Sequence, residues 1–97
     1  MSTISVPIDE VIDANKWKDF HPSDITIDPV TRNYVLIASR EKGLLVMTPD
    51  GDVVRAAPLP GDHRQAEGVA ITTDSLLLIS DESNVRPAAI TLYPWRP

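Results

Sequence analysis

Apolar residues in this chain fall into short runs that are separated by proline, glycine, asparagine and aspartate. Ile25 and Ile27 share one face of an alternating run, and Ile4, Val6 and Ile8 share one face of another. Runs of this kind, bounded by turn-forming residues, are typical of strands. We therefore predict strands at residues 3–8, 25–28, 33–39, 43–48, 53–59, 68–72, 76–80 and 88–94. Their spacing predicts an all-β meander.

Two local signals refine this pattern. Residues 9–17, "DEVIDANKW", are the only segment that suits a helical turn, with Ile8, Val11 and Ile12 on one side. The stretch "PDGD" separates two of the predicted strands, and Gly51 within it can take a positive φ angle. The sequence thus predicts tight hairpins throughout, with residues 9–17 as the only segment for a helical turn.

The two halves of the chain resemble each other. Ser23 aligns with Glu67 at an offset of 44 residues, and residues 36–39 align with residues 77–80 at an offset of 41. A repeat of roughly 40–50 residues with four strands per unit is typical of β-propeller blades. We therefore expect two blades of antiparallel strands in this chain.

A count of the strands leaves the second blade incomplete. Residues 21–60 would form a full four-stranded blade, and residues 63–95 would form a blade that lacks its outer strand. The first strand, at residues 3–8, has no partner in its own chain, so we expect it to complete the blade of a neighbouring copy. Copies arranged head to tail would then close a ring. The alternative is a monomer in which the two sheets form a sandwich.

Composition and charge limit the kinds of molecule that this chain is expected to bind. The chain has 97 residues, which suits one small domain, and no cysteine to form a disulfide or a thiolate metal site. Its net charge of −5, with no basic cluster in the sequence, argues against nucleic acid and against an anionic membrane. No apolar run approaches the roughly 20 residues of a membrane-spanning helix. The start of the chain lacks the pattern of a signal peptide, which predicts a cytoplasmic location if the chain is complete.

Several stretches resemble one known family. They are "HPSDITIDPVTRNYVLIAS", "LLVMTPDGDVVRAAPL", "QAEGVAI", "LLLISDES" and "AAITLYPW". The chain resembles the C-terminal part of SdiA-regulated proteins, a family of six-bladed β-propellers similar in architecture to the NHL and gluconolactonase propellers. The most specific matches are the "EGVA" turn at 67–70 and "ISDE" at 79–82. The family pattern usually has proline where this chain has Ala66, and it has glycines in two hairpins that are missing here. The resemblance implies six blades, and hence a homotrimer of two-blade chains around a polar channel.

The resemblance also implies which residues face that channel. In related propellers the residue before each inner strand points toward the channel, and these positions correspond to Ser23 and Glu67 here. In a trimer, three Glu67 carboxylates would repel one another unless they bind a cation, take up protons or stay hydrated. Oxygen ligands of this kind suit Ca²⁺ or Mg²⁺. The alternative is that Glu67 is an ordinary solvated residue at the rim.

Other residues near the predicted channel mouth are candidates for chemistry. His63 and His21 lie in the loops before the inner strands, where either could act as a general base. Arg64 could pair with Glu67 or bind an anionic ligand. Asp81 could contact and orient the residues that bind the ligand without touching the ligand itself. The alternatives are surface histidines, a simple salt bridge and a turn-capping aspartate. The chain has no G-x-S-x-G, H-E-x-x-H or Walker motif.

Two functions fit these predictions. The first is a binding or scaffold module, a homo-oligomeric ring with an acidic channel mouth that holds a cation or a small ligand. The second is a divalent-metal-dependent hydrolase of the lactonase or esterase type, with Glu67 as metal ligand and His63 or His21 as base. The sequence leaves the substrate open.

Overall fold

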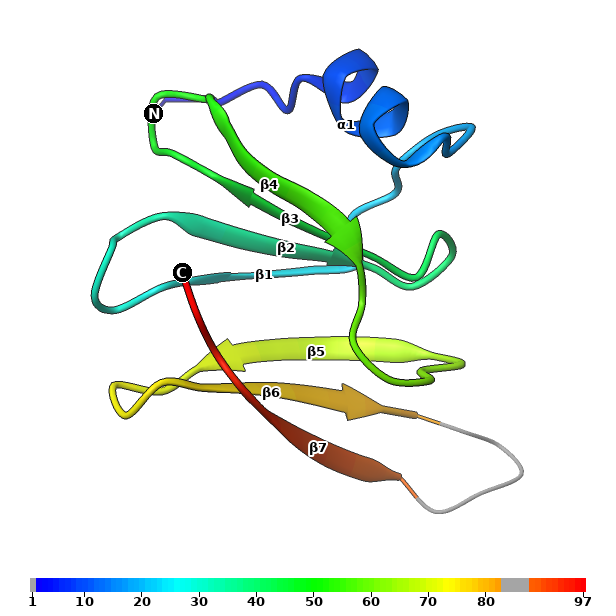
Figure 1. Cartoon of the computed structure of the whole chain (residues 1–97), viewed down its shortest axis with the longest axis vertical. Coiled ribbons are helices and arrows are strands. Elements are labelled where there is room, and N and C mark those ends of the chain that lie inside the picture. The colour runs from blue at the N-terminus through cyan, green and yellow to red at the C-terminus, as the bar shows by residue number, and fades with distance from the viewer. Residues whose placement is uncertain (1, 83–87) are drawn as a thin grey trace.

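The computed structural model describes residues 2–82 and 88–97, which contain one helix and seven strands (Figure 1). These elements are α1 (Ile8–Asn15), β1 (Asp24–Ile27), β2 (Tyr34–Ala38), β3 (Gly43–Met47), β4 (Val53–Pro58), β5 (Ala66–Ile71), β6 (Leu76–Asp81) and β7 (Ala89–Pro94). The strands predicted between residues 25 and 94 are all present, with bounds that shift by one or two residues. The helical turn predicted for residues 9–17 is also present, as α1.

The strands form two antiparallel sheets. The first sheet has the order β1-β2-β3-β4, and the second sheet has the order β5-β6-β7. Figure 1 shows the sheets as two layers, with α1 on the far side of the first sheet and the strands β1 and β5 facing each other. The prediction of an all-β fold with antiparallel sheets of four and three strands is therefore confirmed. None of the described helical residues forms a segment that is long and apolar enough to cross a membrane.

Two apolar clusters hold these layers together. The first lies between the sheets and consists of Val35, Ile37, Leu44, Val46, Leu59, Ala66, Val69, Leu77, Ile79 and Trp95. The second lies between the first sheet and α1 and is built around Val11, Phe20, Leu36, Ala38, Leu45 and Met47. The first sheet thus buries side chains on both faces, because successive residues of a strand point to opposite sides. Every residue of β3 is buried as a result.

The start of the chain differs from its prediction. Residues 2–7 have no regular secondary structure, and Ile8 already belongs to α1, so residues 3–8 are not a strand here. The alternation that suggested a strand has another cause, because Val6 and Ile8 pack on the cluster around Val11. Asp9 and Glu10 in the first turn of α1 interact favourably with the helix dipole. Donation of residues 3–8 to a second copy concerns another chain and stays a prediction.

The hairpin turns use left-handed backbone where the sequence lacks glycine. Gly51 has a φ angle of 96°, as its place in the β3–β4 turn predicted. The two hairpins without glycine place Arg32 (φ 68°) and Ser75 (φ 67°) in the left-handed region instead. Side chains support these turns: Asp28 accepts hydrogen bonds from the backbone of the first hairpin, and Thr72 accepts one from the second. The departures from the family pattern therefore leave the hairpins intact.

Polar contacts also join the two sheets. The Asp24 carboxylate accepts a hydrogen bond of 2.8 Å from the backbone N–H of Val69. The Trp95 indole N–H donates to Asp28 over 2.8 Å, and Asp28 is only 1% exposed. The guanidinium of Arg55 lies 4.8 Å from the Trp95 ring centre, which adds a cation–π contact. These contacts hold Trp95, which follows β7, against the first sheet.

Candidate functional site

Polar side chains gather at one end of the two sheets, where the β2–β3 turn lies beside the loop between β4 and β5. They line a surface hollow of about 490 Å³, whose walls are His21, Ser23, Ser39, Arg40, Lys42, Arg64 and Gln65. Four of the residues predicted from the sequence to matter, namely His21, Ser23, Arg64 and, nearby, Asp81, lie in this region. They lie at the end where β1 and β5 begin, and their role in binding or chemistry stays a prediction.

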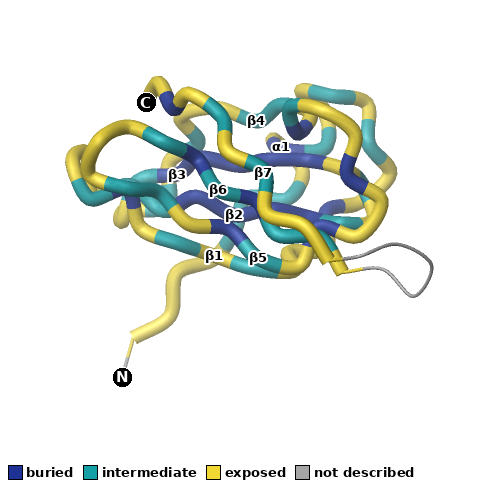
Figure 2. Tube along the Cα trace, turned by 90° about the horizontal axis from the view of Figure 1, so that it is seen from below, coloured by how far each residue is buried: buried dark blue, intermediate teal, exposed yellow. Residues whose placement is uncertain are grey.

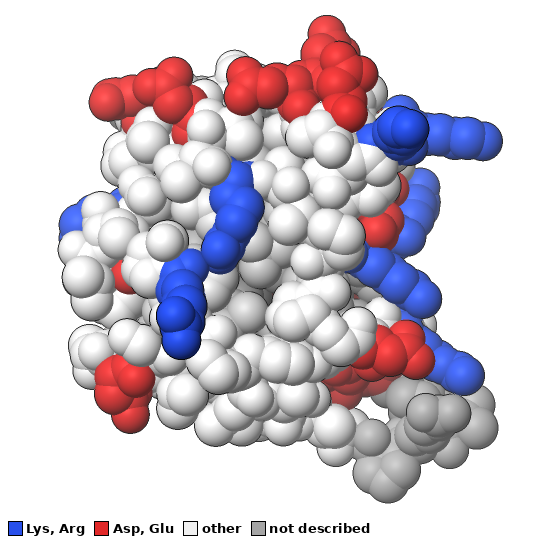
Figure 3. Space-filling view, viewed as in Figure 1, with Lys and Arg blue, Asp and Glu red and all other residues white. Residues whose placement is uncertain are grey.

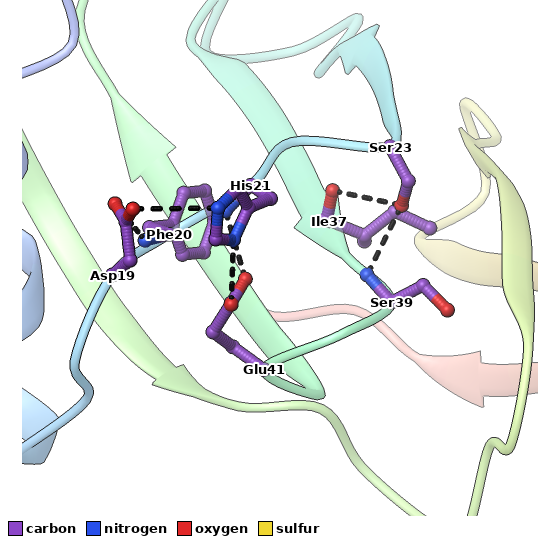
Figure 4. Close-up of polar contacts among 7 residues, drawn as sticks. All are labelled: Asp19, Phe20, His21, Ser23, Ile37, Ser39 and Glu41. Atoms are coloured by element: carbon purple, nitrogen blue, oxygen red, sulfur yellow. Dashed lines mark hydrogen bonds and ion pairs between the residues drawn. The ribbon is translucent and has the colours of Figure 1, made fainter.

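His21 is held between two carboxylates (Figure 4). Its Nδ1 lies 2.8 Å from Glu41 Oε2, its Nε2 lies 3.3 Å from Asp19 Oδ2, and its backbone N–H donates to Glu41 Oε1 over 2.8 Å. Burial alone would raise the pKa of Glu41, but the hydrogen bonds and the charge of His21 outweigh it and lower that pKa. Both ring nitrogens of His21 face carboxylates, although the side chain is 45% exposed and lines the hollow.

Ser23 ties the sheets together at the edge of the hollow. Its hydroxyl lies 3.2 Å from the carbonyl of Ile37 in the first sheet and 3.3 Å from that of Ala66 in the second. The same oxygen accepts the backbone N–H of Ser39 over 3.1 Å (Figure 4). Ser23 therefore acts as a structural bridge within one chain, although its residue remains exposed on one side.

His63 forms a second polar cluster, buried between the sheets. It is 3% exposed, its Nδ1 bonds Asp81 Oδ2, and its Nε2 lies 2.6 Å from the hydroxyl of Tyr93. An ionised carboxylate can only accept, so Nδ1 donates to Asp81; in the neutral imidazole Nε2 then accepts from the Tyr93 O–H. Gly61, with a φ angle of 71°, makes room for this arrangement, because a Cβ there would collide with Tyr93 Oη. The structure thus brings together two predicted residues, His63 and Asp81.

The His63 cluster has the layout of a catalytic triad but not its electrostatics. Burial and the charge of Asp81 both raise the pKa of Tyr93 above its usual value of 10.0. A raised pKa keeps the hydroxyl protonated, whereas a nucleophile needs the opposite shift. The hydrogen bonds of His63 to Asp81 and Tyr93 occupy both ring nitrogens. The cluster therefore fastens the β4–β5 loop to the second sheet.

Glu67 stands apart from both clusters. It is exposed, and it lies at an irregularity in the β5–β6 pairing between Ala66 and Gly68. Within residues 2–82 and 88–97 it forms no ion pair with Arg64, and no three His, Asp or Glu side chains are grouped closely enough to hold a metal ion. A cation site at Glu67 would thus need carboxylates from more than one chain, and that prediction concerns an assembly.

Sequence reasoning missed four residues of this region. Glu41, Arg40 and Lys42 lie in the β2–β3 turn beside the hollow, and Tyr93 reaches His63 from β7. The repeat offered a signal for two of them, because residues 40–41 align with residues 81–82. No signal pointed to Tyr93, whose contact with His63 spans thirty positions of sequence. The hollow is lined by Arg40, Lys42 and Arg64, whereas the acidic channel mouth predicted from Glu67 concerns an assembly and stays a prediction.

Comparison with known proteins gives one match. The family model of SdiA-regulated proteins matches residues 6–93, which is nearly the whole chain. No curated protein and no solved structure matches the chain. The match spans α1, both sheets and the residues of both polar clusters, and it agrees with the resemblance noted in the "EGVA" and "ISDE" turns. The chain therefore belongs to the SdiA-regulated family.

Proposed function

We propose that this protein is a propeller-building module, in which identical chains associate head to tail through their sheet faces to form a homotrimeric ring. The observation that carries this proposal is the outer face of the second sheet. This face is apolar and uncovered within the chain, whereas α1 and its flanking segments cover the outer face of the first sheet except along β1. A sheet face of this kind is normally buried against another layer in a folded assembly.

The register of the second sheet defines this face. Ala70 and Leu92 both lie opposite Leu78, and Ile90 lies opposite Ser80, so all point away from the first sheet. Ile90 is 65% exposed and Leu92 is 55% exposed. Figure 2 shows β7 as largely exposed, in contrast to the buried positions along β2 and β6. We call Ala70, Leu78, Ile90 and Leu92 the outer face.

A second copy of the chain is the partner that fits. The first sheet exposes Ile25 (54%) and Ile27 (45%) on the side away from the second sheet, where α1 covers β4. The outer face of one copy packing on Ile25 and Ile27 of the next gives a heterologous contact, which closes into a ring of three when each copy is rotated by a third of a turn. Three copies of two sheets give the six blades that the family resemblance implies.

The test is the mass in solution. Three chains of 10.7 kDa give a ring of about 32 kDa. Leu92→Asp places a charge in the outer face and should reduce the particle to about 11 kDa, since a buried unpaired charge disfavours association. Val30→Asp is the matched control, because Val30 is 69% exposed in the β1–β2 turn. A wild-type mass of one chain by light scattering would disprove the ring.

A further inference from the structure

We propose that the hollow beside the β2–β3 turn binds the phosphate group of a small molecule. Arg40, Lys42 and Arg64 line it together, from two segments more than twenty residues apart in sequence. Figure 3 shows several Lys and Arg side chains projecting along the edge that carries the β2–β3 turn and the β4–β5 loop, with Asp and Glu side chains between them. This concentration of positive charge is local, because the chain as a whole carries −5.

The charges of these cations are not neutralised by the described carboxylates. The ion pairs within residues 2–82 and 88–97 all involve histidines, and none involves Arg40, Lys42 or Arg64. Glu41 lies between the first two in sequence, but its side chain turns inward onto His21 and is only 10% exposed. The fold thus turns the Glu41 carboxylate away from Arg40 and Lys42, and these two cationic side chains line the hollow.

Two exposed acids also lie close to the hollow. Asp19 Oδ2 lies 3.3 Å from Nε2 of His21, with its side chain 55% exposed, and the backbone N–H of Glu82 donates to the carbonyl of Gln65 over 3.2 Å. Neither acid forms an ion pair with Arg40, Lys42 or Arg64 among the residues that the structure describes. Two exposed carboxylates, one of them paired with His21, offset only part of three positive charges, so the hollow keeps a net attraction for anions.

The donors of the hollow favour phosphate over a simple carboxylate. Two guanidinium groups present forked N–H pairs, which match the spacing of phosphate oxygens, and Lys42 adds a compact positive charge. Ser39 and Gln65 add neutral polar groups to the wall. A dianion with three free oxygens can engage all three cations, whereas a carboxylate has two oxygens and one charge.

Size and total charge point to a small ligand. The hollow, about 490 Å³, is much larger than a phosphate ion and falls within the range of small-molecule sites. The rest of the surface is negative on balance, which disfavours a polyanion such as a nucleic acid. The chemistry that fits is therefore a phosphate monoester on a small organic group.

Inorganic phosphate is a suitable probe for the full chain. Titration followed by backbone amide NMR should show saturable shifts at residues 39–42 and 64–65, with a dissociation constant of about 1 mM. Arg40→Gln combined with Arg64→Gln should weaken binding about tenfold or more. Arg32→Gln, a matched change at the far end of the strands, should leave the affinity unchanged.

Three outcomes would overturn the proposal. They are linear, non-saturating shifts with phosphate, an unchanged affinity in the Arg40/Arg64 double variant, and acetate binding as tightly as phosphate. The melting temperature of the double variant should equal that of wild type, and Arg64→Lys, which keeps the charge, should retain most of the binding. All lining residues belong to one chain, so the result is independent of whether the ring forms.

Discussion

The two sheets come from similar sequence repeats, yet they are buried very differently. The first sheet is covered on one face by the second sheet, and on the other by α1 and the segment before β1, except at Ile25 and Ile27. The second sheet is covered on one face only, and its last strand alternates between half-buried and exposed residues. A segment of about twenty residues outside the repeat therefore breaks the equivalence of the two units. It covers most of the outer face of the first sheet and leaves the outer face of the second sheet exposed.

The largest test of this difference compares two leucines. Leu45 in β3 is fully buried against the α1 cluster, and Leu92 in β7 is 55% exposed. Leu45→Ala should lower the free energy of unfolding by about 2–5 kcal/mol, because it removes buried surface and leaves a cavity. Leu92→Ala should change it by less than about 0.5 kcal/mol in the isolated chain. Urea denaturation at concentrations where the chain is monomeric measures both, and equal losses would contradict the difference between the sheets.

A smaller effect is expected where the sheets are joined by polar contacts. Asp28 accepts hydrogen bonds from the Trp95 indole and from the backbone N–H groups of Val30 and Thr31. Asp28→Ala leaves these donors without their acceptor, so the free energy of unfolding should fall by about 1–3 kcal/mol. Asp50→Ala, at an exposed turn, is the control and should have little effect. A loss no greater than that of Asp50→Ala would show that this contact does not hold the sheets together.

The sequence predicted the strands better than the polar clusters, for physical reasons. Strand positions follow from local alternation and turn residues, and these signals placed all seven strands. Residues 3–8 alternate as a strand would, but their apolar side chains pack on Val11 of the helix, and alternation alone does not distinguish the two. The His63–Asp81 contact was not predicted as a pair, because it depends on how the β4–β5 loop folds back between the sheets. Loop geometry of this kind is set by tertiary packing.

Removing one hydroxyl group tests how much the cluster of His63, Asp81 and Tyr93 contributes to stability. Tyr93→Phe removes the hydroxyl that bonds His63 Nε2, and it should lower the free energy of unfolding by about 1 kcal/mol. Tyr34→Phe is the matched change in the first sheet, where Tyr34 packs against the apolar cluster between that sheet and α1. It should lower the free energy of unfolding by less than about 0.5 kcal/mol. Thermal unfolding of both variants checks the pair. A larger loss from Tyr34→Phe than from Tyr93→Phe would contradict the role assigned to His63.

The smallest expected effect is a difference in pH dependence between the sheets. The pKa values of Asp28 and Glu41 are lowered below their ordinary values of 3.8 and 4.5, since hydrogen bonds, and for Glu41 also the charge of His21, outweigh burial. Their contribution to stability is therefore present above about pH 4.5 and is lost as the pH falls through the lowered values. The pKa of Tyr93 is raised, so its contribution is present below pH 10.0 and is lost as the pH rises further.

Urea denaturation across the pH range separates these contributions. Asp28→Asn should flatten the acid side of the stability profile and leave the alkaline side unchanged. Tyr93→Phe should flatten the alkaline side only, because phenylalanine does not titrate. If Tyr93→Phe instead altered the acid side, the effect of the hydroxyl would not be explained by its own raised pKa. The raised pKa of Tyr93 would then no longer distinguish a structural clamp from a reactive site, and the contrast between the two sheets would have to rest on burial alone.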